Sequence, residues 1–195
     1  MKPARFCSSR YLVVAIVCAM LAISAAPLSA AAAKHQAPRD PQHYQQYLVQ
    51  EVHHRLVMLP FLTLFDNLEY RVDGTKVTLS GYVVRPVLKE DAERTVKGIE
   101  GVTAVDNQIK VLPPSPMDDG IRRAEYRAIY GFAGLWKYAM GALPPVHIVV
   151  DNGHVMLFGV VDSESDKNLI GLRAKTVPNV FSVENNLQVA NQGGQ

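Results

Sequence analysis

The six histidines could ligate a metal ion or act as a base, but their spacing favours neither role. His53 and His54 are adjacent, so on a helix their rings would point about 100° apart. Two ligands on one helix face need an i, i+4 spacing instead. His147 and His154 have no carboxylate pair at ligand spacing beside them. The pattern therefore predicts ordinary surface or half-buried histidines and no metal site.

The acidic and serine-containing clusters lack the partners that catalysis needs. They are Glu90-Asp91-Ala92-Glu93 and Asp162-Ser163-Glu164-Ser165-Asp166. Both stand where a helix is expected to begin, and negative charge there offsets the helix dipole. A serine nucleophile needs a histidine base and an oxyanion hole, and no Gly-x-Ser-x-Gly turn occurs. Gly-x-Gly-x-x-Gly and Walker patterns are also absent, so we expect no enzyme activity and no cofactor.

One segment, residues 130–143, combines aromatic and basic residues in a way that suits a lipid headgroup boundary. It holds the only tryptophan, and arginines precede it. The candidate lipid contacts are Phe132, Leu135, Trp136, Lys137, Tyr138, Arg123 and Arg127. The alternative is that Phe132, Leu135 and Trp136 fill the core of a small domain, which needs large apolar residues.

A second candidate surface lies on an expected strand, 155–161. Its outward positions are Met156, Phe158 and Val160, whereas the matching strand 77–83 has Thr78, Ser80 and Tyr82 there. An apolar stripe on a sheet face without helices should not stay in water. It predicts cover by the first half of the chain, by another copy, or by a partner protein. We take these three residues as a candidate protein interface.

These residues are positioned by a repeat, because two parts of the chain match at a constant offset of 78 residues. Asp73, Val77, Leu79, Gly81 and Val83 correspond to Asp151, Val155, Leu157, Gly159 and Val161. Val102, Val105, Asn107, Ile109 and Val111 correspond to Val180, Val183, Asn185, Leu187 and Val189. Two blocks in one register without a gap indicate duplication.

Each copy reads as helix, hairpin, helix and strand. The first helices are expected to bury Leu48, Val52, Leu56 and Leu59 in copy one, and Ile121, Ala124, Ala128 and Phe132 in copy two. Asp118 or Asp119 is expected to cap the second of these helices. Asp73-Gly74 and Asn152-Gly153 mark the hairpin turns, although the one-residue offset of the glycines leaves the turn register open.

The second helix of copy one is expected to begin at Pro86 and to bury Leu88, Ala92, Val96 and Ile99. In copy two, Ser163 and Asp166 resemble a capping box. A last strand follows in each copy, over 102–111 and 180–189. The predicted fold class is α+β, with two tandem α-β-β-α-β domains, each placing two helices on one face of a three-stranded mixed sheet.

The N-terminus has the three parts of a secretory signal peptide. Lys2, Arg5 and Arg10 precede an uncharged apolar run from Tyr11 to Ile23, and small residues follow it. The run is short for a spanning helix, so cleavage between Ala30 and Lys34 is favoured over a retained anchor. We therefore expect a periplasmic or secreted protein.

Cleavage would change both charge and cysteine content. It removes three basic residues and leaves 17 basic against 18 acidic ones, so nothing points to nucleic acid as a partner. Cys7 and Cys18 also lie in the leader, so no disulfide or thiol is expected beyond it.

The expected organisation has six parts. They are a signal peptide (1–33), a flexible lead-in (34–43), domain one (44–112), a proline-rich linker (113–117), domain two (118–190) and a polar tail (191–195). The linker boundary follows from three prolines within four residues, which can continue neither a helix nor a central strand.

The motifs of both copies resemble the BON domain (bacterial osmotic-stress and nodulation domain). Copy one has Val77-Thr-Leu-Ser-Gly-Tyr-Val83, then Gly101-Val-Thr-Ala-Val-Asp-Asn-Gln-Ile-Lys-Val111. Copy two has Val155-Met-Leu-Phe-Gly-Val-Val161, then Asn179-Val-Phe-Ser-Val-Glu-Asn-Asn-Leu-Gln-Val189, where Asn179 replaces the glycine. The motif marks fold positions, so it implies no particular site residue.

The resemblance implies an envelope protein without known catalysis that binds phospholipid membrane surfaces, with a role in osmotic or envelope stress protection. The alternative that it leaves open is a protein-protein interaction or assembly module of the envelope, including self-association.

Overall fold

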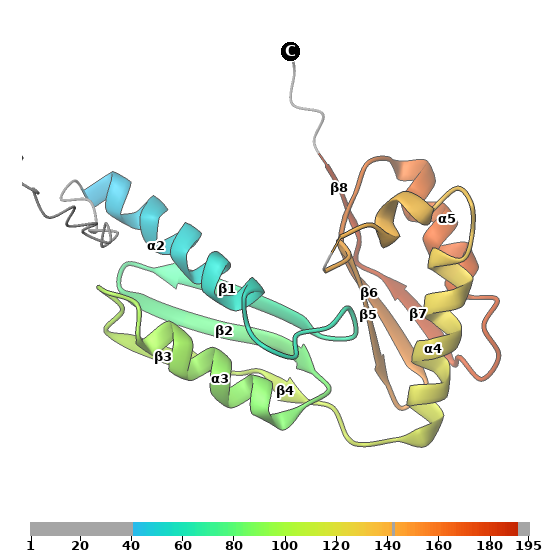
Figure 1. The fold of residues 1–195 in the computed structure, drawn as a ribbon, viewed down its shortest axis with the longest axis horizontal. Helices are drawn as coiled ribbons and strands as arrows, with labels where there is room; N and C mark the ends of the chain where they lie inside the picture. The colour runs from blue at the N-terminus through green and yellow to red at the C-terminus, as the bar shows by residue number, and fades with distance from the viewer. Residues whose placement is uncertain (1–40, 142, 191–195) are drawn as a thin grey trace, which may run out of the picture. The chain divides into compact units, whose positions relative to one another are not determined.

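The computed structural model describes residues 41–141 and 143–190 of the 195-residue chain. The described residues all fall in one compact unit, and Figure 1 shows their fold. The expected signal peptide, most of the lead-in and the polar tail lie outside the described residues. Within the described ranges, no helix is both long and apolar enough to span a membrane.

The first repeat has the order α-β-β-α-β, as predicted. Its helices are α2 (Pro41–Val57) and α3 (Pro86–Lys97), and its strands are β1 (Asn67–Asp73), β2 (Lys76–Val83), β3 (Ala104–Asn107) and β4 (Lys110–Val111). The central strand β2 pairs with β1 in antiparallel fashion and with β3 and β4 in parallel fashion. Both helices pack on the sheet and contact each other, so they cover one face (Figure 1).

The second repeat has the same topology. Its elements are α4 (Pro116–Tyr130), the 3-10 turn η1 (Trp136–Ala139), β5 (Val146–Asp151), β6 (His154–Val161), α5 (Glu164–Ala174), β7 (Ser182–Asn185) and β8 (Gln188–Val189). β6 is central, antiparallel to β5 and parallel to β7 and β8. The fold class is therefore α+β with two tandem domains and mixed sheets, as predicted. The last strand of each copy is not continuous but split in two.

The two hairpins share one register despite their offset glycines. Asp73 pairs with Lys76 and Asp151 pairs with His154, so each turn has two residues. Gly74 has a φ of 61°, and Asn152 and Gly153 have φ values of 52° and 79°. Asparagine tolerates this left-handed conformation, so it takes the place of the glycine of copy one.

The start of α4 differs from the sequence expectation. Ser115 caps the helix, because its Oγ accepts a hydrogen bond from the backbone N of Asp118 at 3.2 Å. Pro116 is the first helical residue, a position where the missing N–H costs nothing. The expected caps Asp118 and Asp119 thus lie within the first turn. The lead-in is also shorter than expected, because α2 begins at Pro41.

Each repeat has its own hydrophobic core. The predicted stripe of copy one, Leu48, Val52, Leu56 and Leu59, is buried, as are Leu88, Ala92, Val96 and Ile99 on the second helix. In copy two the predicted stripe is rotated. Ile121 is buried, but Ala124 and Ala128 are half-buried and Phe132 is exposed. The buried face of α4 instead carries Arg122, Glu125 and Ile129. Hydrophobic periodicity missed this face because two of its residues are charged.

Candidate ligand and interaction surfaces

The turn η1 presents some aromatic side chains to solvent and buries others. Trp136 is 62% exposed, and Met140, which directly follows the turn, is 64% exposed. Leu135 and Tyr138 are buried in the core of the second repeat. Trp136 is therefore a surface residue, whereas the burial of Leu135 and Tyr138 removes them from the surface that a lipid could touch.

Acidic residues of the second repeat hold Lys137 in place. Its Nζ lies 2.7 Å from Oδ2 of Asp162 and 2.8 Å from Oδ2 of Asp166. These hydrogen bonds raise the pKa of Lys137 above its ordinary value and lower the pKa of Asp166. The Tyr138 hydroxyl donates to Asp166 and accepts from the backbone N of Asp162, both at 2.8 Å. Lys137 and Tyr138 thus fix the turn that carries Trp136.

The remaining basic and aromatic candidates lie along α4 and after it. Phe132 is 38% exposed, with the guanidinium of Arg173 5.1 Å from its ring centroid. Arg127 and Arg123 are exposed on α4. Arg123 lies in the second turn of the helix, whereas Phe132 and Trp136 follow its end, so the structure does not bring all the candidates into one patch.

The outward face of β6 is partly covered by the first repeat. Met156 and Phe158 are half-buried and Val160 is exposed. The rings of Phe158 and Tyr82 are stacked, with centroids 6.3 Å apart and planes 29° apart. A cavity of about 500 Å³ lies beside them, lined by the helix-free faces of both sheets, including Met156 and Lys110. The first repeat therefore covers part of the apolar stripe on β6, but Val160 stays exposed.

Two of the described histidines, His147 and His154, have hydrogen-bond partners. His147 Nδ1 lies 2.6 Å from the backbone O of Asp66. Since a carbonyl can only accept, Nδ1 carries the hydrogen. Burial lowers the pKa of His147, which favours the neutral ring. His154 bonds to Ser182 at 2.7 Å. In the part of the chain that the structure describes, no three His, Cys, Asp or Glu residues gather closely enough to hold a metal ion.

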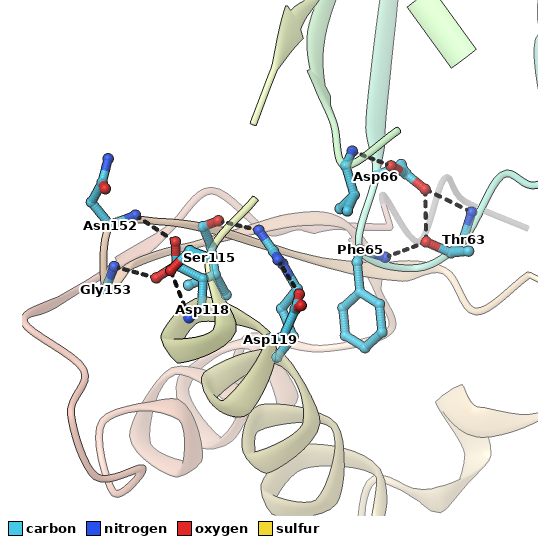
Figure 2. Close-up of polar contacts among 11 residues, drawn as sticks. Thr63, Phe65, Asp66, Ser115, Asp118, Asp119, Asn152 and Gly153 are labelled. Carbon is cyan, nitrogen blue, oxygen red and sulfur yellow. Dashed lines mark hydrogen bonds and ion pairs between the residues drawn. The ribbon is translucent and has the colours of Figure 1, made fainter. Parts of the chain in front are cut away.

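Three buried charged residues of α4 escaped the sequence analysis. Figure 2 shows Asp118, whose carboxylate accepts from the backbone N of Asn152 at 3.0 Å and of Gly153 at 2.9 Å, and so closes the β5–β6 turn. Arg122 donates to the backbone O of Val150 at 2.6 Å and to Asp119 at 2.7 Å. No sequence signal marks these roles, since they depend on tertiary contacts.

Glu125 is the third of these residues, and it is completely buried. Neither of its carboxyl oxygens has a hydrogen-bond partner among the described residues. Burial raises its pKa from 4.5 to about 8. Burial therefore favours the neutral form of this carboxyl at pH 7.

Comparison with known proteins identifies the repeats. The model of the BON domain matches residues 50–113 and 118–191. Osmotically-inducible protein Y of Escherichia coli (strain K12) is 31% identical over 133 residues, which cover 63% of this chain and 61% of that protein. The chain thus matches less than two thirds of the length of this relative.

Solved structures give a weaker likeness. Two structures of CdsD, a structural protein of the type III secretion system of Chlamydia trachomatis, align with 14% and 13% identity and TM-scores of 0.27 and 0.28. They cover 73% and 75% of this chain and 96% and 95% of the solved chains. Likeness at this level establishes neither fold nor function.

The two matches of the family model coincide with the two α-β-β-α-β repeats and span most of the sequence, so this chain belongs to the BON domain family.

Proposed function

We propose that this protein is a non-enzymatic module of the bacterial cell envelope that binds phospholipid membrane surfaces and acts in osmotic or envelope stress. Three sources support the proposal. They are the sequence of the leader, the membership in the BON domain family, and the relative that is named for its osmotic induction.

The observation that carries the membrane contact is the exposure of Trp136 on a turn that is held rigidly. A large apolar ring with a polar N–H suits the boundary between headgroups and acyl chains. Met140 and Phe132 add apolar surface nearby in the chain, and Arg127 and Arg173 add positive charge. Leu135, Lys137 and Tyr138 take a positioning role in this proposal, since they anchor the turn.

The chain has a single tryptophan, so its fluorescence reports on this contact alone. Vesicles of phosphatidylglycerol and phosphatidylethanolamine should pellet the protein and shift Trp136 emission to shorter wavelength. Trp136→Ala should weaken vesicle binding by between about tenfold and about 150-fold, because burial of a large aromatic ring contributes about 1.5–3 kcal/mol.

Phe181→Ala is the matched control, because Phe181 is a similarly exposed aromatic residue (69%) at a different place. Its backbone N donates to the O of Gly153, in the turn before β6. The turn η1, in contrast, is bound through Lys137 to Asp162, which follows the end of β6. The proposal fails if wild-type protein stays in the supernatant with unchanged emission, or if both variants lose the same affinity.

A second candidate function is protein binding at the outward face of β6. The exposure of Val160 next to the half-buried Met156 and Phe158 favours it. Val160→Asp should then break a complex or self-association measured by sedimentation, while circular dichroism stays unchanged. Phe158→Asp is a poorer test, because it also disturbs the stack on Tyr82. Persistence of the complex in Val160→Asp excludes this face.

A further inference from the structure

We propose that a cavity between the first repeat and the start of α4 binds a phosphate group. The cavity has a volume of about 150 Å³, and three arginines, Arg85, Arg122 and Arg123, line it. It stands apart from the membrane contact through Trp136, because Arg122 and Arg123 lie near the beginning of α4 and Trp136 follows its end. Phosphate binding in this cavity therefore does not rest on the function proposed above, whereas a lipid headgroup as the source of the phosphate does.

The wall from the first repeat is a closed loop before β1. Asp66 is buried, and its carboxylate accepts from the backbone N of Thr63 at 2.9 Å, from the Thr63 hydroxyl at 2.7 Å and from the backbone N of Val84 at 2.7 Å. Figure 2 shows this closure next to Phe65. The Asp66 carboxylate therefore already accepts three hydrogen bonds within this wall, and the wall is formed before any ligand binds.

Hydrogen bonds also hold this loop against the second repeat. The backbone N of Ile148 donates to the O of Leu64 at 2.8 Å, and His147 donates to the O of Asp66 at 2.6 Å. Leu64 and Phe65 pack against the core of the second repeat. The loop is thus tied to β5 of the second repeat on both sides of Phe65, so this wall of the cavity is preorganised for a ligand.

Positive charge dominates the cavity. Its three guanidinium groups face two carboxylates, and one of these, Asp66, is already saturated by its own loop. Arg85 and Arg123 are exposed, and no ion pair ties either of them to an acidic side chain within the described residues. Guanidinium groups bind phosphate through paired hydrogen bonds of fixed geometry. Two of them are therefore free to turn toward an anion.

Arg122 supplies the built part of the site. It is only 3% exposed, and its Nη atoms bind Asp119 and the O of Val150. Its Nε is buried without an acceptor among the described residues. A buried charged donor without a partner is costly, so a small shift of the Arg122 side chain that lets Nε donate to a phosphate oxygen would be favourable. Asp119 competes for the same guanidinium, so we expect binding to loosen its ion pair.

A residue near the cavity favours a lipid headgroup as the source of the phosphate. Phe61 is 60% exposed, with the guanidinium of Arg85 5.4 Å from its ring centroid. Its φ of 68° is unusual for an aromatic residue, so the backbone is strained at the point where the Phe61 ring is exposed to solvent. An exposed ring beside a phosphate-binding arginine suits a lipid better than a free ion.

The test uses the full chain and three probes: inorganic phosphate, glycerol 3-phosphate, and vesicles of phosphatidylglycerol with phosphatidylethanolamine. Calorimetry gives the affinity, and the NMR signal of the Arg122 Nε–H reports on contact at that atom. The variant is Arg85→Gln with Arg123→Gln, two exposed side chains that make no hydrogen bond to the backbone of the described residues. The control is Arg71→Gln with Arg94→Gln, which removes equal charge from the exposed surface of the first repeat.

We expect glycerol 3-phosphate to shift the Arg122 signal and the variant to bind it about tenfold more weakly than wild type or the control, since each charge-assisted bond is strong. Equal affinities of variant and control, or no shift of the Arg122 signal with any probe, overturn the proposal. Loss of vesicle binding in the variant alone supports a lipid headgroup, and its retention supports a soluble phosphate. Failure of all proteins to bind vesicles, with soluble phosphate still bound, removes the membrane function and keeps the site.

Discussion

Asn107 and Asn185 make the same pair of hydrogen bonds in the two repeats. The Nδ2 of Asn107 donates to the O of Lys89, and the Nδ2 of Asn185 donates to the O of Lys167, both at 2.9 Å. Their Oδ1 atoms accept from the backbone N two residues later, at 3.2 and 3.3 Å. Each asparagine thus joins the second helix to the break in the last strand. The carboxamide thus satisfies a backbone N–H at the break, and both copies have an asparagine at this position.

Replacing either asparagine by alanine should destabilise its own repeat. Asn107→Ala leaves the backbone N of Ile109 without its partner, so we expect a loss of about 1–3 kcal/mol in the free energy of unfolding. Urea denaturation measures it. The control is Gln108→Ala, whose side chain bonds, among the described residues, only to Asp106. Equal stability of the two variants would contradict the role given to the asparagine.

Gly159 and Gly120 should respond to alanine in opposite ways. Gly159 has a φ of 117°, and a Cβ there would lie 1.9 Å from the O of Pro145. Gly120 is helical, with open space around the position of a Cβ. We expect Gly159→Ala to cost more than about 3 kcal/mol through strain and clash. Gly120→Ala should raise the free energy of unfolding by about 0.5–1 kcal/mol, because alanine has the higher helix propensity. Thermal melts of both variants check this, and a tolerated Gly159→Ala would mean that the strands adjust.

The parts of the fold that follow from local pattern could be predicted from the sequence. The stripe of Leu48, Val52 and Leu56 has helical spacing, and Pro86 marks a helix start by its missing N–H. The start of α4 was mistaken because Ser115 stands in a proline-rich stretch that reads as a linker. Its flanking proline is itself compatible with a first helical turn.

The candidate surfaces could be predicted only in part. The composition of residues 130–143 marks Trp136 as notable, but its exposure depends on how Leu135 and Tyr138 pack. The cavity lined by Arg85 and Arg122 escaped prediction because these residues lie in different repeats and come to line one cavity only in the folded chain. Buried charges such as Glu125 contradict the apolar periodicity on which a helix face is assigned.

Asp66→Ala should loosen the contact between the repeats. The substitution removes three hydrogen bonds that close the loop before β1. We expect the free energy of unfolding to fall by about 3 kcal/mol. We also expect faster hydrogen exchange at the backbone amide of Ile148, which donates to the O of Leu64 in this loop. Glu100→Ala, an exposed change in the first repeat, is the control. If the amide of Ile148 stays protected in Asp66→Ala, the loop holds its shape without the carboxylate.

Glu125 should make the protein less stable as the pH rises from about 4.5 to about 8. The pKa of Glu125 is about 8 in the folded protein and 4.5 in the unfolded chain. Between pH 4.5 and pH 8 the folded protein therefore holds a proton that the unfolded chain has lost. Stability therefore falls with rising pH through this window, by about 3 kcal/mol at pH 7, since one pKa unit corresponds to about 1.36 kcal/mol.

Glu125→Met replaces the carboxyl with an apolar group of similar shape and removes this dependence. The measurement is the free energy of unfolding in urea at several pH values, for wild type, Glu125→Met and the exposed control Glu90→Met. Taking the difference between wild type and variant cancels the titration of the other carboxylates. We expect that difference to grow steadily from pH 5 to pH 8 in Glu125→Met and to stay flat in Glu90→Met. Parallel profiles for wild type and Glu125→Met would mean that the buried carboxyl titrates normally, and so that it finds a partner in solution.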